Sequence, residues 1–362
     1  MKLRTILMGA IATTAFAPLA LADGERGRDG EVKIIYWQAP SIMTPYLSGG
    51  TKDLEAASLV IEPLGRYDET GALVPFLAEE IPTVENGGVS EDLKSITWKL
   101  KEGLLWSDGT PVTSADVKFT AEYCMHPEGG CAQGAKFDGV ESIDIIDDLT
   151  LTVNFSEAKP NPYGPFMGAQ SPIIQAAQFA ECLGPKAPEC TEANFNPIGT
   201  GPFMVTDFRP NDVIQLEANP NYRDPSKPAF ASVTFKGGGD AVMETGEYDY
   251  AWNMQLAPDV LAKMAEAGKG KPISAFGTLV ERIEMNMTDP SPDLPEGERA
   301  TVAHPHPILS DFKVRKALSM AIDRELLVEV GYGQAGRPTC NLVPAPALYA
   351  SDNTECLTQD IE

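Results

Sequence analysis

The chain has 362 residues and a formal net charge of −24, from 28 basic and 52 acidic side chains. This length is sufficient for roughly two or three globular domains, and a hydrophobic content of 43% excludes a generally disordered chain. The strong negative charge argues against a nucleic-acid-binding protein, because phosphates would repel it. The 30 prolines and 32 glycines indicate many turns, so a simple helical bundle is not expected.

Residues 1–22 have the pattern of a secretory signal peptide. Lys2 and Arg4 form a positive n-region, an apolar stretch follows over 6–21, and the stretch ends in a cleavage pattern at Ala22. Two threonines and a proline interrupt the apolar stretch, which makes the alternative, an uncleaved membrane anchor, a poor fit. We therefore expect export to the periplasm.

Six cysteines fall into three close pairs: Cys124 with Cys131, Cys182 with Cys190, and Cys340 with Cys356. In an oxidising compartment an even number of cysteines is typical of disulfides. The sequence allows many connectivities, and the clustering favours bonds within each close pair. Reactive or metal-binding cysteines are the alternative, but the short spacing typical of zinc sites is absent.

Segments with strand and helix patterns alternate along the chain. We expect strands over 32–37, 95–100, 203–205, 213–216 and 282–287, and a hairpin over 141–155. We expect helices over 53–64, 114–123, 260–267 and 311–330. Thr113 or Ser114 is the expected N-cap of the second helix, and Pro63 is expected to close the first. The mixture predicts an α/β or α+β protein.

Four groups of residues occur in an order that is typical of one family. They are ITWKLKEG with WSDGTPVTSADV over 96–117, IGTGPF with NPNY over 198–222, GEYDYAW over 246–252, and HPILSD with VRKAL and AIDR over 306–324. Together they resemble the peptide/nickel class, family 5, of extracellular solute-binding proteins, which are receptors of ATP-binding-cassette importers. The resemblance covers about 32–346.

The resemblance implies an α/β fold with two lobes, the periplasmic-binding-protein fold of class II and cluster C type, with an extra subdomain. Lobe I would use 31–68 and 195–280, and the extra subdomain would use 69–194. Lobe II would start at 281 and be incomplete over 281–362, because family members are longer. We therefore expect that the chain is a fragment truncated in lobe II.

The resemblance also implies a cleft in which a ligand is bound without any bond being broken. The best candidates to line the cleft follow strand ends: Trp37, Gln38, Ala39, Trp252 and Asn253. Indole rings form an aromatic wall, and side-chain amides both donate and accept hydrogen bonds. The alternative for each tryptophan is core packing, which we expect for Trp98 because it lies inside an alternating strand.

We expect oligopeptides as ligands, an inner-membrane permease as partner, a monomer, no nucleic acid and no cofactor or metal. Nickel chelates, sugars, opines or haem are alternative ligands, and a ligand sensor is an alternative role. His304 and His306 flank a proline without an adjacent third ligand, so we expect loop histidines and not a metal pair. Gly199 and Gly201 precede Pro202 and no Gly-Lys-Ser/Thr, so a phosphate loop is not indicated. A secreted enzyme is a distant alternative, since neither the Gly-x-Ser-x-Gly nor the His-Glu-x-x-His hydrolase motif occurs.

Overall fold

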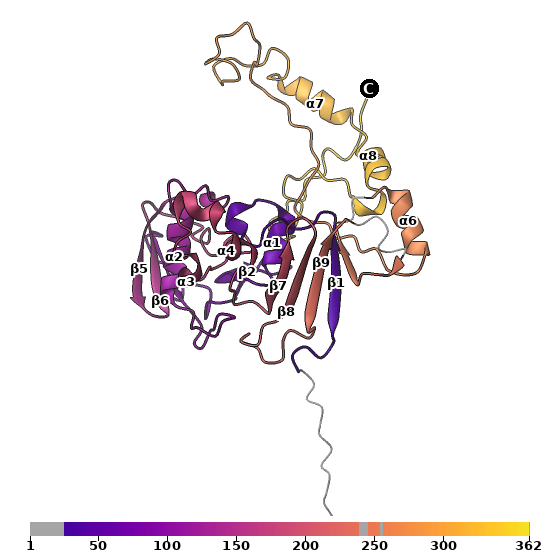
Figure 1. Cartoon of the computed structure of the whole chain (residues 1–362). Helices are drawn as coiled ribbons and strands as arrows, with labels where there is room; N and C mark the ends of the chain where they lie inside the picture. The colour runs from indigo at the N-terminus through magenta and orange to yellow at the C-terminus, as the bar shows by residue number, and fades with distance from the viewer. Residues whose placement is uncertain (1–24, 239–244, 254–255, 362) are drawn as a thin grey trace, which may run out of the picture.

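The computed structural model describes residues 25–238, 245–253 and 256–361 (Figure 1). The predicted signal peptide, 1–22, lies outside the described residues. The first part of the chain contains two main β-sheets with helices packed on them (Figure 1). The later segment with α7 (Phe312–Met320) and α8 (Arg324–Gly331) extends away from this body, above the larger sheet in Figure 1.

The larger sheet is built from five strands: β1 (Glu31–Tyr36), β7 (Phe203–Arg209), β8 (Val213–Ala218), β9 (Ser232–Gly237) and β10 (Tyr250–Trp252). Their order is β10-β1-β9-β8-β7. Strand β1 is parallel to β9 and to β10, whereas β8 is antiparallel to both of its neighbours. The carboxyl ends of β10, β1 and β9 therefore meet at one edge of the sheet.

One face of this sheet packs against helix α1 (Thr51–Ala57). Strand side chains alternate between faces, and Tyr36 and Phe235 lie in a buried cluster that also contains Ala56 and Ala57 of the helix. The two alanines have small side chains, so α1 can approach the sheet closely. The end of β1 is thereby fixed against the helix.

Helix α1 is shorter than the helix predicted over 53–64, so that prediction is wrong in its extent. The helix ends at Ala57, and the backbone N–H groups of Gly201 and Phe203 donate to the carbonyls of Val60 and Leu59 at 2.8 and 3.1 Å. These carbonyls accept hydrogen bonds from a distant segment and not from the next turn of a longer helix. The helix therefore ends because of hydrogen bonds to a distant segment, well before Pro63.

The second sheet has three antiparallel strands: β4 (Ser95–Lys99), β5 (Val140–Asp147) and β6 (Thr150–Phe155). Helix α2 (Ser114–Met125) begins with the N-cap Thr113, whose backbone N–H donates to the Asp116 carboxylate at 2.9 Å. This is a capping box. Trp98 is fully buried in the core beneath this helix, as predicted.

Shorter elements complete the body. They are the hairpin β2 (Gly65–Tyr67) and β3 (Leu73–Pro75), the helices α3 (Ala176–Phe179), α4 (Thr191–Phe195) and α6 (Pro258–Glu266), and the 3₁₀ turns η1 (Pro45–Leu47), η2 (Gly134–Phe137), η3 (Gly184–Glu189) and η4 (Gly333–Ala335). No described helix is both long and apolar enough to cross a membrane.

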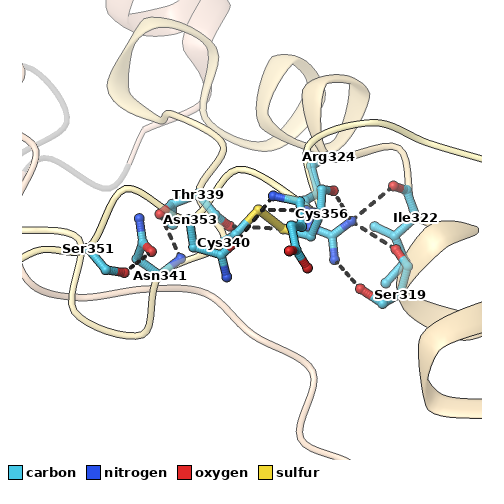
Figure 2. The surroundings of a disulfide bond; sticks show 10 residues. Ser319, Ile322, Arg324, Thr339, Cys340, Asn341, Ser351, Asn353 and Cys356 are labelled. Carbon is cyan, nitrogen blue, oxygen red and sulfur yellow. Dashed lines mark hydrogen bonds between the residues drawn. A yellow bond between two sulfur atoms is a disulfide. The ribbon is translucent and has the colours of Figure 1, made fainter. Parts of the chain in front are cut away.

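The three predicted disulfides are confirmed. Two of them, Cys124–Cys131 and Cys182–Cys190, lie in the part of the chain that carries the three-stranded sheet. The third, Cys340–Cys356, joins two turns of the later segment (Figure 2). The Arg324 guanidinium donates to the carbonyls of Cys356 and Ser319, both at 2.9 Å, and so attaches this disulfide to the start of α8.

The later segment departs from two predictions. The single helix expected over 311–330 is two helices, because the Asp323 carboxylate accepts the Leu326 N–H at 2.9 Å and starts α8 anew. The strand expected over 282–287 is wrong, since no described neighbour pairs with it. Neither α7 nor α8 has a buried residue, so their apolar side chains are largely exposed.

Candidate functional site

Two predicted binding residues meet at the carboxyl edge of the larger sheet. Trp37 directly follows β1, and Trp252 ends the neighbouring parallel strand β10, where it pairs with Tyr36. The centroids of the two indole rings lie 5.0 Å apart, with 50° between the ring planes. Segments far apart in the sequence thus form one aromatic surface.

Tyr36 and Phe235 connect this surface to the core of the sheet. The Tyr36 ring lies 5.1 Å from the ring of Trp252 and 5.3 Å from that of Phe235. Burial raises the pKa of the Tyr36 hydroxyl, and the nearby Glu55 carboxylate adds to the increase. Tyr36 therefore stays neutral under all ordinary conditions. The sequence interpretation missed it, although its position beside Trp37 at a strand end was a usable signal.

The indole rings of Trp37 and Trp252 are each half-buried: one part packs on the core of the sheet and another part is accessible. Gln38 and Asn253 are exposed, and among the described residues neither side-chain amide has a hydrogen-bond partner. An aromatic wall with free amide groups is suited to a ligand with both apolar and amide groups. The next two residues, Met254 and Gln255, lie outside the described residues.

Ala39 is buried, with 8% of its surface exposed, and it contacts the end of β9. A Cβ atom placed on Gly237 would lie 1.9 Å from the backbone nitrogen of Ala39. Only glycine allows this approach, so the loop after β1 lies directly against β9. Gly237 therefore shapes the site by letting this loop approach β9.

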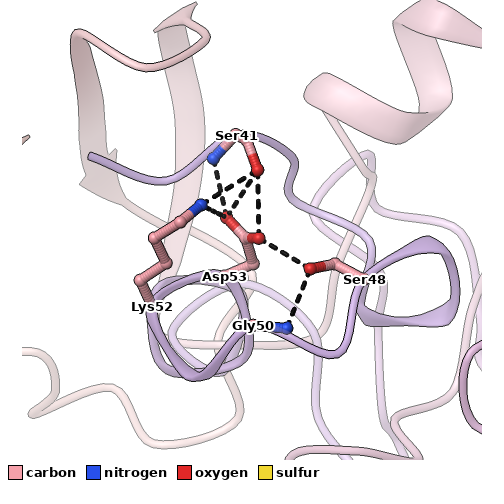
Figure 3. Close-up of polar contacts among 5 residues, drawn as sticks. All are labelled: Ser41, Ser48, Gly50, Lys52 and Asp53. Atoms are coloured by element: carbon pink, nitrogen blue, oxygen red, sulfur yellow. Dashed lines mark hydrogen bonds and ion pairs between the residues drawn. The ribbon is translucent and has the colours of Figure 1, made fainter. Parts of the chain in front are cut away.

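The loop after β1 is also bonded to helix α1 through Asp53, which the sequence interpretation did not single out (Figure 3). The Asp53 carboxylate is 2% exposed and accepts the Ser41 N–H at 2.6 Å and the Ser48 hydroxyl at 2.7 Å. The Lys52 ammonium lies 3.0 Å from the same carboxylate. Burial would raise the pKa of Asp53, but the hydrogen bonds from Ser48 and Ser41 and the Lys52 charge lower it overall.

Other candidate chemistry in the sequence has a structural role. Asp108 accepts the Thr110 N–H at 2.9 Å within a turn, and a Cβ atom on Gly199 would lie 1.8 Å from the Val60 carbonyl oxygen. The His304 ring nitrogen lies 2.9 Å from Glu298. Within 25–238, 245–253 and 256–361, no group of three or more His, Cys, Asp or Glu side chains is arranged to hold a metal ion.

A cavity of about 280 Å³ lies elsewhere on the larger sheet. Its lining consists of Lys33, Arg209, Asp212, Val213, Thr234, Lys236, Glu247 and Tyr248. The cavity is mostly lined by polar and charged side chains, from strands β1 and β9, from the turn between β7 and β8, and from the segment before β10. None of the five predicted binding residues lines it. It is therefore separate from the aromatic edge.

Comparison with known sequences gives a consistent result. The family model for bacterial extracellular solute-binding proteins, family 5 middle, matches residues 72–360. The glutathione-binding protein GsiB of Escherichia coli O1:K1 is 26% identical over 348 residues, which cover 94% of this chain and 60% of GsiB. GsiB of Escherichia coli K12 is 26% identical over 316 residues, covering 85% of this chain and 55% of GsiB. The chain thus spans little more than half the length of these relatives.

Solved structures show the same fold. CtaP, an ABC transporter substrate-binding protein of Listeria monocytogenes, gives a TM-score of 0.69 at 22% identity, covering 93% of this chain and 63% of CtaP. NikA of Brucella suis with Fe(III)-EDTA gives 0.68 at 20% identity, covering 92% and 62%. The oligopeptide-binding protein AppA of Bacillus subtilis with a nonapeptide gives 0.67 at 20% identity, covering 93% and 62%. The predicted α/β fold, that of two-lobed periplasmic binding proteins, is confirmed.

Proposed function

The chain belongs to family 5 of the bacterial extracellular solute-binding proteins, and we propose that it captures peptides for an ATP-binding-cassette importer. The observation that carries this proposal is the pair of accessible indole rings, Trp37 and Trp252, beside the exposed side-chain amides of Gln38 and Asn253. Aromatic faces accept varied side chains, and amides bond to a peptide main chain. We include Ala39 in the proposed site because its contact with Gly237 holds the loop after β1 against β9.

The known ligands of related proteins favour a peptide over other classes of ligand. The GsiB proteins are named for glutathione, a small peptide, and AppA was solved with a nonapeptide. NikA was solved with Fe(III)-EDTA, a metal chelate, so a chelate is the second candidate ligand. Because this chain spans 60% of GsiB or less, the ligand is a proposal for this chain and does not follow from the family alone.

The mechanism we propose is capture without catalysis. In the proposed division, 31–68 and 195–280 form lobe I, 69–194 form the extra subdomain, and 281–362 contribute to lobe II. A ligand that contacts both lobes favours the closed arrangement by the free energy of the contacts that only this arrangement makes. The exposed apolar side chains of α7 and α8 are available to pack within such a second lobe.

The proposed location is the periplasm, reached through the signal peptide over 1–22. Three disulfides support an oxidising compartment. The closed, ligand-bound protein would dock on an inner-membrane permease whose ATPases drive import. We expect it to act as a monomer and to bind no nucleic acid, because its net charge of −24 repels phosphates.

The test is native mass spectrometry of the exported protein, followed by calorimetric titration with defined probes. The probes are glutathione, the nonapeptide Arg-Pro-Pro-Gly-Phe-Ser-Pro-Phe-Arg and the nickel–histidine complex. Co-purified peptide masses, or heat of binding with either peptide, would support the proposal. Binding of the nickel complex alone would replace peptide by chelate as the ligand class. A folded protein that binds none of the three would contradict the importer function.

A further inference from the structure

The loop that carries Trp37 is held at three points behind its exposed surface. Ala39 lies against Gly237 of β9, as described above. The Pro40 carbonyl accepts the Asn211 N–H at 3.0 Å. Ser41 is bonded to Asp53 of α1, and this third attachment is the one that involves a buried charge (Figure 3). Only three residues separate Ser41 from Trp37.

The third attachment is a network around one carboxylate. Besides the Ser41 N–H and the Ser48 hydroxyl, the Ser41 hydroxyl donates to Asp53 at 3.1 Å. The Lys52 ammonium bonds to the Ser41 hydroxyl at 3.0 Å as well as to Asp53. The Ser48 hydroxyl accepts the Gly50 N–H at 3.0 Å. We call Ser41, Ser48, Lys52 and Asp53 the Asp53 clasp.

The clasp joins the loop to a helix that is itself fixed to the sheet. Helix α1 contributes Ala56 and Ala57 to the buried cluster that contains Tyr36, the last residue of β1. The chain therefore leaves the sheet at Tyr36, which packs against α1, and passes through Trp37. At Ser41 it contacts α1 again, through Asp53. Hydrogen bonds to a charged group are stronger than those between neutral groups.

Helix α1 does not use Asp53 as an ordinary capping residue. Asp53 is the third residue of the helix, a position from which a carboxylate commonly reaches back to the N-cap N–H. Here both oxygens are directed to Ser41 and Ser48, in the preceding loop (Figure 3). The chain thus uses this buried charge to order the loop and not to cap the helix.

We propose that Asp53 is a positioning residue of the binding site, which holds Trp37 in place against Trp252 before any ligand arrives. This inference rests on the proposed function for the benefit to binding, but the placement of Trp37 can be tested without a ligand. A site that is ordered in advance avoids the cost of ordering a loop when the ligand binds. Loss of the clasp should loosen Trp37 and leave Trp252 in its strand.

The test uses Asp53→Ala and the milder Asp53→Asn, with Asp108→Asn as the matched control. Asp108 also accepts several hydrogen bonds, from Thr110 at 2.9 and 2.6 Å and from Gln175 at 2.9 Å, but it lies in a turn of the extra subdomain. The first measurement is the exciton couplet of the tilted tryptophan pair in the circular dichroism of the ligand-free protein. Trp37→Phe identifies the couplet by removing it.

We expect Asp53→Ala to lose a measurable part of the couplet at a temperature far below its melting point, because the attachments at Ala39 and Pro40 remain, and Asp53→Asn to lose less. Glutathione should bind to Asp53→Ala about tenfold more weakly, the size expected when binding must also order a loop. Asp108→Asn should keep both the couplet and the affinity, even where its urea midpoint falls.

A folded Asp53 variant with an unchanged couplet would overturn the positioning role and leave Asp53 a stabilising residue only. If Asp53→Ala does not fold, the same comparison is made with Asp53→Asn. Should wild type fail to bind glutathione while the couplet depends on Asp53, the clasp is supported and the ligand assignment fails. The two failures are therefore distinguishable.

Discussion

The carboxylate of Glu62 is bonded by both terminal nitrogens of Arg223, at 2.5 and 3.1 Å. Glu62 is 1% exposed and also accepts the Thr200 hydroxyl at 3.1 Å, while its backbone carbonyl accepts the Ile173 N–H at 2.9 Å. This one residue thus connects the turn after α1 with three later segments. The contacts join the sheet of the proposed lobe I to the proposed extra subdomain.

Replacing one partner of this pair should destabilise the protein strongly. Arg223→Met removes the two-point ion pair of the buried Glu62 carboxylate, which should cost about 3 kcal/mol of the free energy of unfolding. The double variant Glu62→Gln with Arg223→Met should recover part of this loss. Urea unfolding measures all of these values.

The matched control is Arg209→Met. Arg209 forms ion pairs with Asp207 and Asp212, but its side chain is 59% exposed. Exposed pairs of this kind contribute less than about 1 kcal/mol. Equal losses for Arg223→Met and Arg209→Met would show that the Glu62 pair is no stronger than a surface contact.

Gly199→Ala should be among the most damaging single substitutions in the body. The new Cβ atom would lie 1.8 Å from the Val60 carbonyl oxygen, so the backbone must move and lose the bond between Gly201 N–H and that oxygen. We expect a loss of at least about 3 kcal/mol, at the upper end of overpacking effects. Gly134→Ala, whose Cβ atom would meet nothing within 4 Å, is the control and should change stability little. Equal melting temperatures for the two variants would contradict the close approach.

Local signals predicted β1, β4, β7, β8, the β5–β6 hairpin, the Thr113 cap and the disulfides, because each depends on residues close together in the sequence. The same signals wrongly predicted a strand over 282–287. The end of α1 was not predictable in this way, since the Gly201 N–H comes from a distant segment. Trp37 and Trp252 lie together because β1 and β10 are parallel neighbours. The register of these two strands depends on both segments, so it could not be predicted from either one alone. The sequence did not indicate Asp53 as a site residue, because its role depends on hydrogen bonds from Ser41 and Ser48 in the preceding loop. Asp323 is a typical N-cap residue and could have predicted the start of α8. The continuous apolar periodicity over 311–330 instead favoured one long helix.

All six cysteines should be protected from a maleimide in the denatured, unreduced protein, and all six should react after reduction. Replacing Cys182 and Cys190 together by alanine should lower the free energy of unfolding by about 2–3 kcal/mol, as expected for a short closed loop. Mass spectrometry counts the labels, and urea unfolding gives the stability. Labelling before reduction would show that at least one bond is absent.

The stability of the protein should depend on pH through Asp53. Its pKa in the folded protein lies below the ordinary value of 3.8, so the unfolded chain binds the proton more readily. The contribution of Asp53 is therefore complete above the ordinary value and is lost as the pH falls through the lower folded pKa. The difference in urea midpoint between wild type and Asp53→Asn should shrink over that acidic range. A difference independent of pH would exclude the Asp53 charge as its source.

Trp252→Leu should separate ligand binding from packing. The ring of Trp252 lies 5.1 Å from that of Tyr36 and is half-buried, so its loss should lower the free energy of unfolding by about 1 kcal/mol. Loss of the accessible ring face should weaken peptide binding about tenfold, a typical effect of removing one aromatic anchor. The control Trp98→Leu removes a fully buried ring and should cost several times more stability without altering the affinity of the folded fraction. If Trp252→Leu lowers stability and leaves peptide affinity intact, then Trp252 serves the core of the sheet and the ligand lies elsewhere.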